Sequence, residues 1–340
     1  APQQLSDFDA DIGGFKLAPT GDSVVVWADQ KDCPDLACAA TTFPAKPEGG
    51  GRTYDKMFVR HWDSWAEPGV RNRLYAFPIE NGKLAGGGVR LTGALEGDTP
   101  SKPFGGGEEL AISPDGRNLV VVGNSEGKSR IWLRSIDSLD GRSVPGTEGA
   151  AGFPFWSPDG RSIAFQANGK LKRIDLADGT VREIASLISD IRGFDGSWSI
   201  DGTILYHMGG SGILRISASG GEAQLLTGYE PRQDGIDRWP RFLPDGKHFL
   251  FLSTSTNQQK SELFLGSTDS PERTLLFAAD SNAFYALSAD GRAGQVLFSR
   301  GGDLLAQGFD PNSHKTVGEP FRVADRIRLN FNSRAFFSVS

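Results

Sequence analysis

The sequence predicts an all-β fold, a six-bladed β-propeller, and three observations carry this prediction. Glycine and proline (44 Gly and 19 Pro) make up roughly a fifth of the 340 residues, and both destabilise helices while favouring turns. Apolar residues alternate in short strand-like runs along the whole chain, without helical periodicity sustained over three turns. One strand–turn–strand pattern recurs at the period typical of a four-stranded propeller blade.

The recurring unit is a Pro-Asp-Gly-like turn between two apolar strands. Proline presets φ, aspartate bonds back to the backbone and glycine takes the left-handed conformation, so each aspartate is interpreted as a turn former. Five copies are clear, and a sixth, degenerate copy precedes the apolar run at 23–28. The turn glycines recur about every 42–46 residues, at Gly21 (degenerate), Gly116, Gly160, Gly202, Gly246 and Gly291.

We expect one propeller domain over residues 1–340, with a third and a fourth strand after each hairpin. Between Gly21 and Gly116 lie about two blade lengths but only one clean set of strands. A long insertion in the first blade, at about 30–72, explains the excess, and a seventh blade is the alternative. The expected blades are about 5–95, 105–148, 149–190, 191–232, 233–278 and 279–340.

Tryptophans recur within these blades. Trp156, Trp198 and Trp239 are interpreted as occupying equivalent blade positions. Large aromatic side chains at repeated positions are typical of the core between neighbouring sheets. We therefore expect these three residues to pack rather than to bind a ligand.

Charge and hydropathy exclude several partners. The net charge is −6 and the isoelectric point is near 5.4, so we expect no nucleic-acid binding. No apolar run approaches the 18 or so residues of a membrane-spanning helix, so we expect no membrane insertion. Glycine clusters at 49–51, 86–88 and 105–107 do not lead from a strand into a helix, which argues against phosphate loops.

The two cysteines and the first residues bear on the compartment. Cys33 and Cys38 lie close together in a polar loop, which favours a small disulfide in an oxidising compartment; two free thiols are the alternative. The chain opens Ala1-Pro2 without an initiator methionine, as an exported chain does after removal of its signal peptide. A trimmed expression product would begin in the same way. We expect a periplasmic or secreted protein.

An aromatic and charged stretch within the insertion is one candidate binding site. It contains Arg60, His61, Trp62, Asp63 and Trp65. Tryptophan and arginine dominate binding hot spots, so the stretch suits a recognition surface. It suits a buried plug as well, with the tryptophans packed and Arg60 paired to Asp63.

Residues 5–109 resemble the beginning of the propeller in bacterial prolyl oligopeptidase-family serine peptidases of the dipeptidyl- or acylaminoacyl-peptidase type. The similar segments are 11–17 (Asp-Ile-Gly-Gly-Phe-Lys-Leu), 58–65 (Phe-Val-Arg-His-Trp-Asp-Ser-Trp) and 99–109 (Thr-Pro-Ser-Lys-Pro-Phe-Gly-Gly-Gly-Glu-Glu). Residues 110–340 resemble TolB-like (WD40-like) propellers, which are often appended to bacterial kinases and regulators. There the similar segments are 130–139, 145–149, 155–160 and 238–246. Both resemblances imply a propeller.

The peptidase resemblance implies a role for Glu108 and Glu109. In dipeptidyl peptidases, paired propeller glutamates hold the N-terminal ammonium of the substrate, and the placement of Glu108 and Glu109 before a strand looks similar. We expect this pair near the mouth of a central channel. The alternative interpretation is a solvated acidic loop beside a strand.

Catalytic motifs are missing from the chain. A peptidase of this family needs a Gly-x-Ser-x-Gly elbow followed by an aspartate and a histidine, and the sequence contains no such elbow. The four histidines show no metal-ligand spacing, so we expect no metal site, no catalytic residues and no cofactor. The leading hypothesis is a non-catalytic propeller that binds a protein, peptide or small ligand. The alternative is the substrate-gating propeller of a serine exopeptidase whose hydrolase domain lies outside this chain.

Overall fold

The structure is a computed structural model of the 340-residue chain. Structural statements below concern the described residues, and for 60–61, 64–65 and Ser125 only the backbone is described. The described residues are 3–8, 10–31, 35–36, 60–61, 64–65, 69–93, 95, 97–102, 105–125, 127–138, 140–187, 195–207, 212–227, 235–255, 260–288, 293–330 and 333–340.

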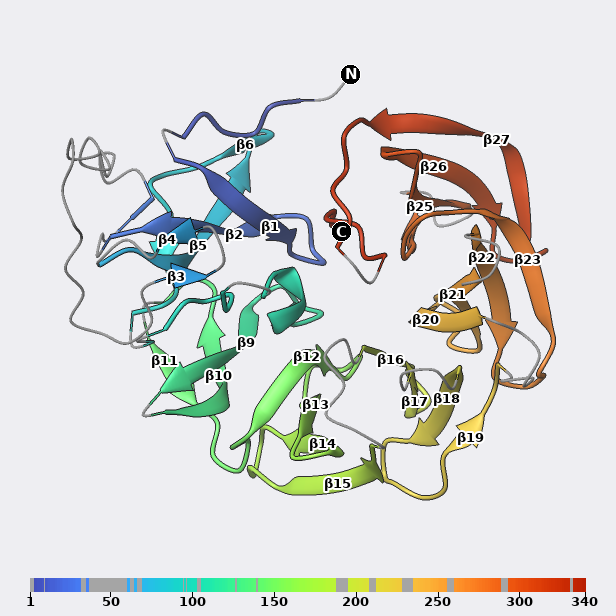
Figure 1. Cartoon of the computed structure of the whole chain (residues 1–340), viewed down its shortest axis with the longest axis horizontal. Helices are drawn as coiled ribbons and strands as arrows, with labels where there is room; N and C mark the ends of the chain where they lie inside the picture. Colours follow the sequence, from blue (N-terminus) through green and yellow to red (C-terminus); the bar gives the residue numbers. More distant parts are fainter. Residues whose placement is uncertain are drawn as a thin grey trace. The chain divides into compact units, whose positions relative to one another are not determined.

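The chain forms two compact units, Gln3–Val144 and Pro145–Ser340, and each is described by itself. Both are built from antiparallel sheets, and in every large sheet except the first the neighbouring strands follow one another along the chain (Figure 1). The first unit holds two large sheets and the second unit holds four.

The two sheets of the first unit differ in regularity. The first sheet has the strand order β1-β2-β5-β6, with β7 paired to β5, and the second has the order β11-β10-β9-β8. The strands are β1 (Ile12–Leu17), β2 (Ser23–Gln30), β5 (Arg71–Glu80), β6 (Lys83–Leu84), β7 (Val89–Arg90), β8 (Leu110–Ile112), β9 (Asn118–Ser125), β10 (Lys128–Ser135) and β11 (Gly141–Ser143).

The predicted insertion in the first blade is confirmed. Strand β2 pairs with β5 from Ser23 opposite Pro78 to Gln30 opposite Arg71, so the chain leaves this sheet after Gln30 and returns at Arg71. Within the intervening stretch, β3 (Arg60–His61) pairs with β4 (Ser64–Trp65) as a short hairpin. As far as the structure describes it, the long span between the first two turn repeats therefore holds an insertion and not another four-stranded sheet.

The second unit repeats one four-stranded meander four times. Its sheets have the orders β12-β13-β14-β15, β16-β17-β18-β19, β20-β21-β22-β23 and β24-β25-β26-β27. The strands are β12 (Ala150–Trp156), β13 (Ser162–Ala167), β14 (Lys170–Asp175), β15 (Val181–Ser186), β16 (Gly196–Trp198), β17 (Thr203–His207), β18 (Ile213–Ser217), β19 (Gln224–Leu225), β20 (Gly235–Phe242), β21 (His248–Ser255), β22 (Lys260–Ser267), β23 (Arg273–Ala278), β24 (Phe284–Leu287), β25 (Gly294–Arg300), β26 (Asp303–Asp310) and β27 (Lys315–Ala324).

The Pro-Asp-Gly repeats form tight turns between the first two strands of their sheets, as predicted. The Gly160 amide donates to the Ser157 carbonyl at 2.9 Å, and the Gly246 amide donates to the Leu243 carbonyl at 3.0 Å. Gly160 and Gly246 have φ values of 69° and 71°, a left-handed conformation that glycine adopts without strain. The turn around Gly291 lies outside the described residues.

Apolar side chains pack between neighbouring sheets within each unit. In the first unit Trp27 of β2 and Leu110 of β8 share one cluster. In the second unit Leu263 of β22 and Phe298 of β25 share another. Full burial of side chains of this size contributes about 1.5–3 kcal/mol each, so this packing holds the sheets of a unit together.

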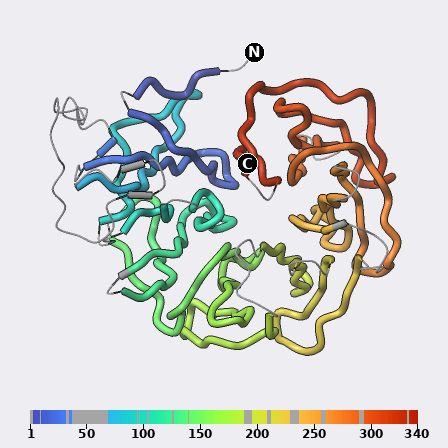
Figure 2. The backbone as a smooth tube through the Cα atoms, viewed as in Figure 1, coloured from blue at the N-terminus to red at the C-terminus, as the bar shows by residue number. Residues whose placement is uncertain are grey.

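The C-terminal segment packs inside the second unit, where Figure 2 shows it turning back after β27. Leu329 and Ala335 form an antiparallel bridge. Asn282, just before β24, donates its backbone amide to the Ser333 carbonyl and accepts the Ala335 amide with its side chain. The segment is thereby fixed beside the first strand of the last sheet.

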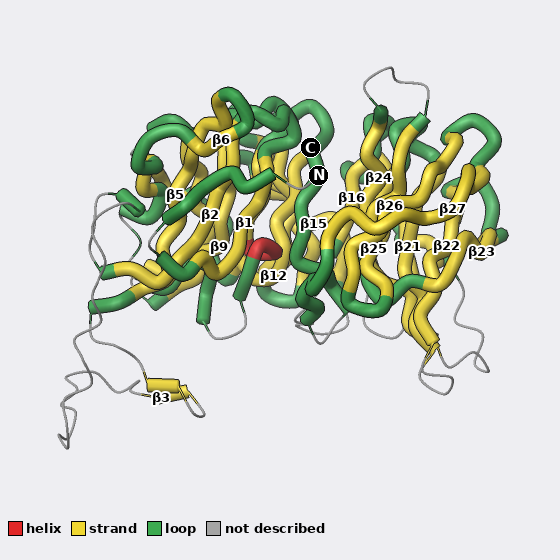
Figure 3. Tube along the Cα trace, turned by 90° about the horizontal axis from the view of Figure 1, so that it is seen from above, coloured by secondary structure: helices red, strands yellow, loops and turns green. Residues whose placement is uncertain are grey.

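The six large sheets among the described residues make the fold an all-β six-bladed β-propeller, as predicted, and not the seven-bladed alternative. Figure 3 shows one helical element in this part of the chain, the 3-10 turn η1 (Gly107–Glu109). Over the same residues, no helix has the length and apolar character needed to cross a membrane.

Candidate functional site

The predicted ligand residues Glu108 and Glu109 lie together on η1, directly before β8. The backbone amide and the hydroxyl of Ser101 donate to the two carboxylate oxygens of Glu109, at 2.6 and 2.5 Å. The Lys16 ammonium donates to the carbonyls of Gly107 and Leu110, on either side of the pair. The first unit thus supplies hydrogen-bond donors to the Glu109 carboxylate and to the backbone on either side of the pair.

The environment of Glu109 changes its protonation. Burial raises the pKa of its carboxyl and outweighs the two Ser101 hydrogen bonds, which lower it, so the pKa lies above its usual value. Binding of an ammonium by Glu108 and Glu109 stays a prediction.

The other predicted residues lie largely beyond the structural description. Arg60 and His61 form β3, but their side chains are not described. Trp62 and Asp63 lie outside the described residues, and so do Cys33 and Cys38. The recognition surface and the disulfide therefore stay predictions.

A second polar site, which we name the arginine cluster, lies in the unit Pro145–Ser340. Its central ion pair joins Arg241 Nη2 to Asp195 Oδ2 at 2.7 Å. The Asp195 side chain is 5% exposed and that of Arg241 21%, so the pair is largely removed from water. The cluster comprises Phe153, Asp195, Trp239, Arg241, Phe284 and Arg334.

The guanidinium groups of this cluster lie over aromatic rings. The Arg241 guanidinium lies over the ring of Phe284, with Cζ 5.5 Å from the centroid. The Arg334 guanidinium, from the C-terminal segment, lies 5.1 Å from the ring of Phe153 and 5.5 Å from that of Trp239. These are distances at which a cation is attracted by a ring face.

The arginine cluster joins all four sheets of the second unit. Phe153 belongs to β12, Asp195 precedes β16, Arg241 belongs to β20 and Phe284 belongs to β24. Arg241 also donates to the Gly196 carbonyl of β16 at 3.0 Å. The first strands of the four sheets therefore meet around one group of charged side chains.

The position of Trp239 corrects the interpretation of the repeated tryptophans. Trp156 and Trp198 come directly before the first residue of a turn. Trp239 instead precedes Leu243, the first residue of its turn, by four positions and so corresponds to Phe153. The mistake arose because aromatic residues occur at two different positions of the same strand.

A bulge in β20 places Trp239 in the cluster. The pairing of β20 with β21 shifts register between Arg238 and Arg241. Trp239 within the bulge has a φ of 59°, a conformation that bulky residues rarely adopt, and is 1% exposed. Its ring meets those of Phe153 and His207 edge-on, at centroid distances of 5.9 and 5.7 Å. Bulges of this kind redirect side chains towards a site.

His207 is the buried neighbour of the arginine cluster. Burial lowers the pKa of its imidazole to about 4; the Asp195 carboxylate opposes this shift, while Arg238 and Arg241 add to it. The imidazole is therefore uncharged near neutral pH. Its Nδ1 atom is buried without a hydrogen-bond partner in the part of the chain that the structure describes.

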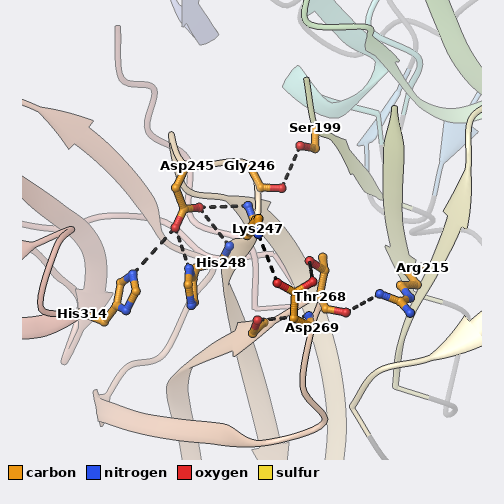
Figure 4. A network of polar contacts seen from close by, with 10 residues as sticks. Ser199, Arg215, Asp245, Gly246, Lys247, His248, Thr268, Asp269 and His314 are labelled. Atoms are coloured by element: carbon orange, nitrogen blue, oxygen red, sulfur yellow. Dashed lines mark hydrogen bonds and ion pairs between the residues drawn. The ribbon is translucent and has the colours of Figure 1, made fainter. Parts of the chain in front are cut away.

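A third polar site, the histidine cluster, consists of Asp245, His248 and His314 (Figure 4). Nδ1 of His248 lies 2.5 Å from Oδ2 of Asp245, and Nε2 of His314 lies 3.7 Å from the same oxygen. The two imidazole rings are 3.8 Å apart between centroids, with planes inclined by 40°. One carboxylate oxygen is therefore approached by two histidines from different sheets.

Sequence reasoning missed both sites in the second unit. The histidine cluster draws on the turn after β20, the start of β21 and the turn between β26 and β27. The arginine cluster combines four first strands with the C-terminal segment. Contacts between different sheets leave no regular spacing along the chain, so no motif indicated either site.

Comparison with known proteins supports a partial likeness to peptidases. No family model matches the chain. Dipeptidyl-peptidase 5 of Arthroderma otae is 27% identical over 175 residues, which cover 45% of this chain and 24% of that protein. The enzyme of the same name from Aspergillus oryzae is 29% identical over 186 residues, covering 46% and 25%. The match thus spans about a quarter of the length of these curated relatives.

Solved structures resemble the chain in fold. A prolyl endopeptidase structure gives a TM-score of 0.53 at 13% identity and covers 95% of this chain and 44% of its own. The β-propeller domain of the Trilobed protease from Pyrococcus furiosus gives 0.52 at 12% identity, covering 94% and 86%. A putative TolB from Agrobacterium tumefaciens gives 0.48 at 16% identity, covering 81% and 84%. The two protease structures confirm the predicted resemblance to peptidase propellers, as a likeness of fold.

Proposed function

We propose that the chain is a non-catalytic β-propeller that binds a peptide, protein or small ligand, and that the arginine cluster receives an acidic group of this ligand. The observation that carries the proposal is the placement of Arg241 and Arg334 on aromatic rings where four first strands meet.

The chemistry of arginine favours a carboxylate as the group bound. A guanidinium presents several N–H donors in a planar fork, which matches the two oxygens of a carboxylate. The rings of Phe153 and Trp239 hold the Arg334 guanidinium in place, so less conformational freedom is lost on binding. We therefore expect peptides with a free C-terminal carboxylate to bind better than their amides.

Titration calorimetry with N-acetylated peptides, either with a free C-terminus or amidated, tests this proposal. We expect Arg334→Gln to weaken binding of the free acid by tenfold or more and to leave binding of the amide unchanged. Arg173→Gln is the matched control, because Arg173 also lies over a tryptophan, Trp198 at 5.6 Å, but outside the cluster. Equal affinity for acid and amide, or equal loss in both variants, would contradict the role of the cluster.

The second candidate is the substrate-gating propeller of a serine exopeptidase whose hydrolase domain lies outside this chain. The partial identity to dipeptidyl-peptidase 5 favours it. In this role Glu108 would hold the substrate ammonium, while Glu109 would act through its bonds to Ser101. We expect Glu108→Gln to weaken binding of free-amine peptides by tenfold or more, with N-acetylated peptides unaffected.

One assay tests the non-catalytic proposal, and a pair of variants tests gating. We expect the isolated chain to hydrolyse no aminoacyl- or acylaminoacyl-anilide, and turnover by the purified chain would contradict the non-catalytic proposal. Glu109→Gln is the matched control for Glu108→Gln. It should lower the unfolding temperature, because it disturbs the hydrogen bonds from Ser101. Any change in peptide affinity should be the same for free-amine and N-acetylated peptides. Equal binding of free and acetylated peptides to the unaltered chain would remove the support for gating.

We also propose that the protein works in an oxidising compartment, periplasmic or extracellular. The closely spaced pair Cys33 and Cys38 supports this proposal. Intact mass measured with and without reduction, together with alkylation, should show both thiols protected in an exported sample. Two free thiols in an unreduced exported sample would count against it.

A further inference from the structure

We propose that Asp245, His248 and His314 form a binding site for a divalent transition-metal ion of the zinc class, which links the third and fourth sheets of the unit Pro145–Ser340. Asp245 and His248 belong to the sheet β20–β23, and His314 belongs to the sheet β24–β27. The proposal is independent of the ligand role of the arginine cluster.

The donor set determines the class of ion. Two imidazole nitrogens and one carboxylate oxygen form a mixed set that Zn²⁺ and its neighbours accept, whereas Ca²⁺ and Mg²⁺ prefer oxygen ligands throughout. One potential ligand atom from each residue lies within 4.8 Å of the other two. Metal–ligand bonds of about 2.0–2.2 Å place tetrahedral ligands about 3.4 Å apart. To enclose an ion, the 2.5 Å contact of His248 with Asp245 must lengthen by about 0.9 Å and the 3.7 Å contact of His314 must shorten by about 0.3 Å.

The carboxylate is oriented before any ion binds. Oδ1 of Asp245 accepts the backbone amides of Lys247 and His248, both at 2.9 Å. These two bonds use one oxygen and fix the carboxylate plane, while Oδ2 faces the two imidazoles. Hydrogen bonds that orient a ligating side chain in this way are typical of metal sites.

The histidines are also held by the backbone. His248 opens β21, where it pairs with Ser267 of β22. His314 lies in the turn between β26 and β27 with a φ of 56°, a left-handed conformation found in few non-glycine residues. The side chains of His248, His314 and Asp245 are 26%, 30% and 37% exposed, so an ion can reach them from solvent. Three protein ligands leave a fourth position for water or for a group of a bound molecule.

A hydrogen-bonded turn is the simpler alternative. It accounts for the contact between Asp245 and His248, which lie three positions apart in one turn. The contact between the two imidazole rings, 3.8 Å between centroids, also brings Nε2 of His314 to within 3.7 Å of the same Oδ2 atom. A metal ion explains both contacts, because it needs ligands that converge.

Calorimetric titration with zinc chloride after dialysis against EDTA tests the proposal, with thermal unfolding as a second measurement. We expect Zn²⁺ to bind and to raise the unfolding temperature, since an ion that binds only the folded state stabilises it. Mg²⁺ and Ca²⁺ should have no effect. His248→Asn and His314→Asn should each weaken zinc affinity at least tenfold. Asparagine at 314 also tolerates the positive φ, which guards against misfolding.

Two controls make the result specific. His61→Asn removes another histidine, and Cys33→Ser with Cys38→Ser removes both thiols; neither variant should change zinc affinity. Circular dichroism and the unfolding temperature in EDTA show whether each variant is folded. Three results would overturn the proposal. The unaltered chain could fail to bind zinc, or folded His248→Asn and His314→Asn could both keep its zinc affinity. Zinc affinity could also be lost only in the His61 or the cysteine variant.

Discussion

Two equivalent turns, at 157–160 and 243–246, use the same Pro-Asp-Gly sequence for different purposes. In the first, the Ser157 hydroxyl donates to Oδ1 of Asp159 at 2.6 Å and accepts the Ser162 amide at 2.9 Å. In the second, Leu243 replaces the serine and is 3% exposed in the apolar core. Oδ2 of Asp245 is then approached by two histidines.

The comparison shows that the Pro-Asp-Gly sequence determines the hairpin but not the partners of its aspartate. Both turns close with the same backbone hydrogen bond, so proline, aspartate and glycine determine the hairpin. The residue before proline decides whether the turn is stabilised by a hydroxyl or by apolar packing. In the second turn no serine hydroxyl donates to the Asp245 carboxylate, so this carboxylate can contact the two histidines instead.

The largest expected effect comes from Leu243→Ala. Leu243 belongs to an apolar cluster with buried residues from three sheets, so its truncation should lower the free energy of unfolding by about 2–5 kcal/mol. Urea unfolding measures this loss, with Leu225→Ala as the matched control because that leucine is 48% exposed. Similar losses in the two variants would show that Leu243 is not a core residue of its turn.

Ser157→Ala should have a smaller effect on the first turn. It removes a hydroxyl that serves Asp159 and the buried Ser162 amide, and leaves that amide without its side-chain partner. We expect a loss of about 1–2 kcal/mol in the free energy of unfolding. Ser219→Ala, at an exposed position, is the control and should stay within about 0.5 kcal/mol of the unaltered chain.

The pKa of Asp159 provides a third test. The Ser157 hydroxyl, followed by the Arg161 amide, holds the pKa of Asp159 below its usual value of 3.8. Because the folded-state pKa is depressed, the ionised carboxylate contributes stability above pH 3.8, and this contribution is lost as the pH falls through the folded-state pKa. In Ser157→Ala the pKa measured by NMR should rise towards 3.8. An unchanged pKa of Asp159 in Ser157→Ala would show that backbone hydrogen bonds alone cause the shift.

The smallest expected effect on stability is that of His248→Asn in the absence of metal. The turn at 113–116 carries Asn118 at the corresponding position, so the fold accepts asparagine there. We expect the free energy of unfolding in EDTA to change by less than about 0.5 kcal/mol. The reciprocal Asn118→His should not create a zinc response, because the Ser113 hydroxyl already donates to Asp115. A zinc response in Asn118→His would show that any turn histidine is sufficient.

The repeat made most of the fold predictable from sequence. Proline, aspartate and glycine act locally, so the turns could be identified one by one, and their spacing gave six blades and the insertion between Gln30 and Arg71. The bulge at Trp239 was missed, because one extra residue in a strand changes neither the turn nor the repeat length.

The sites were less predictable than the fold. Glu108 and Glu109 were singled out by resemblance, yet the Ser101 contacts that orient Glu109 are specific to the folded chain. Asp195 and Arg241 lie on different sheets, and Arg334 joins them from the C-terminal segment. Such groups form only when sheets pack, so sequence spacing carries no signal for them.

The most direct measurement is X-ray diffraction from zinc-loaded crystals at energies above and below the zinc absorption edge. We predict an anomalous difference peak about 2.0–2.2 Å from Oδ2 of Asp245, Nδ1 of His248 and Nε2 of His314. The peak should be missing from crystals of His314→Asn grown in the same way. Zinc peaks only at other residues, or none beside Asp245 in crystals soaked to saturation, would contradict the metal site.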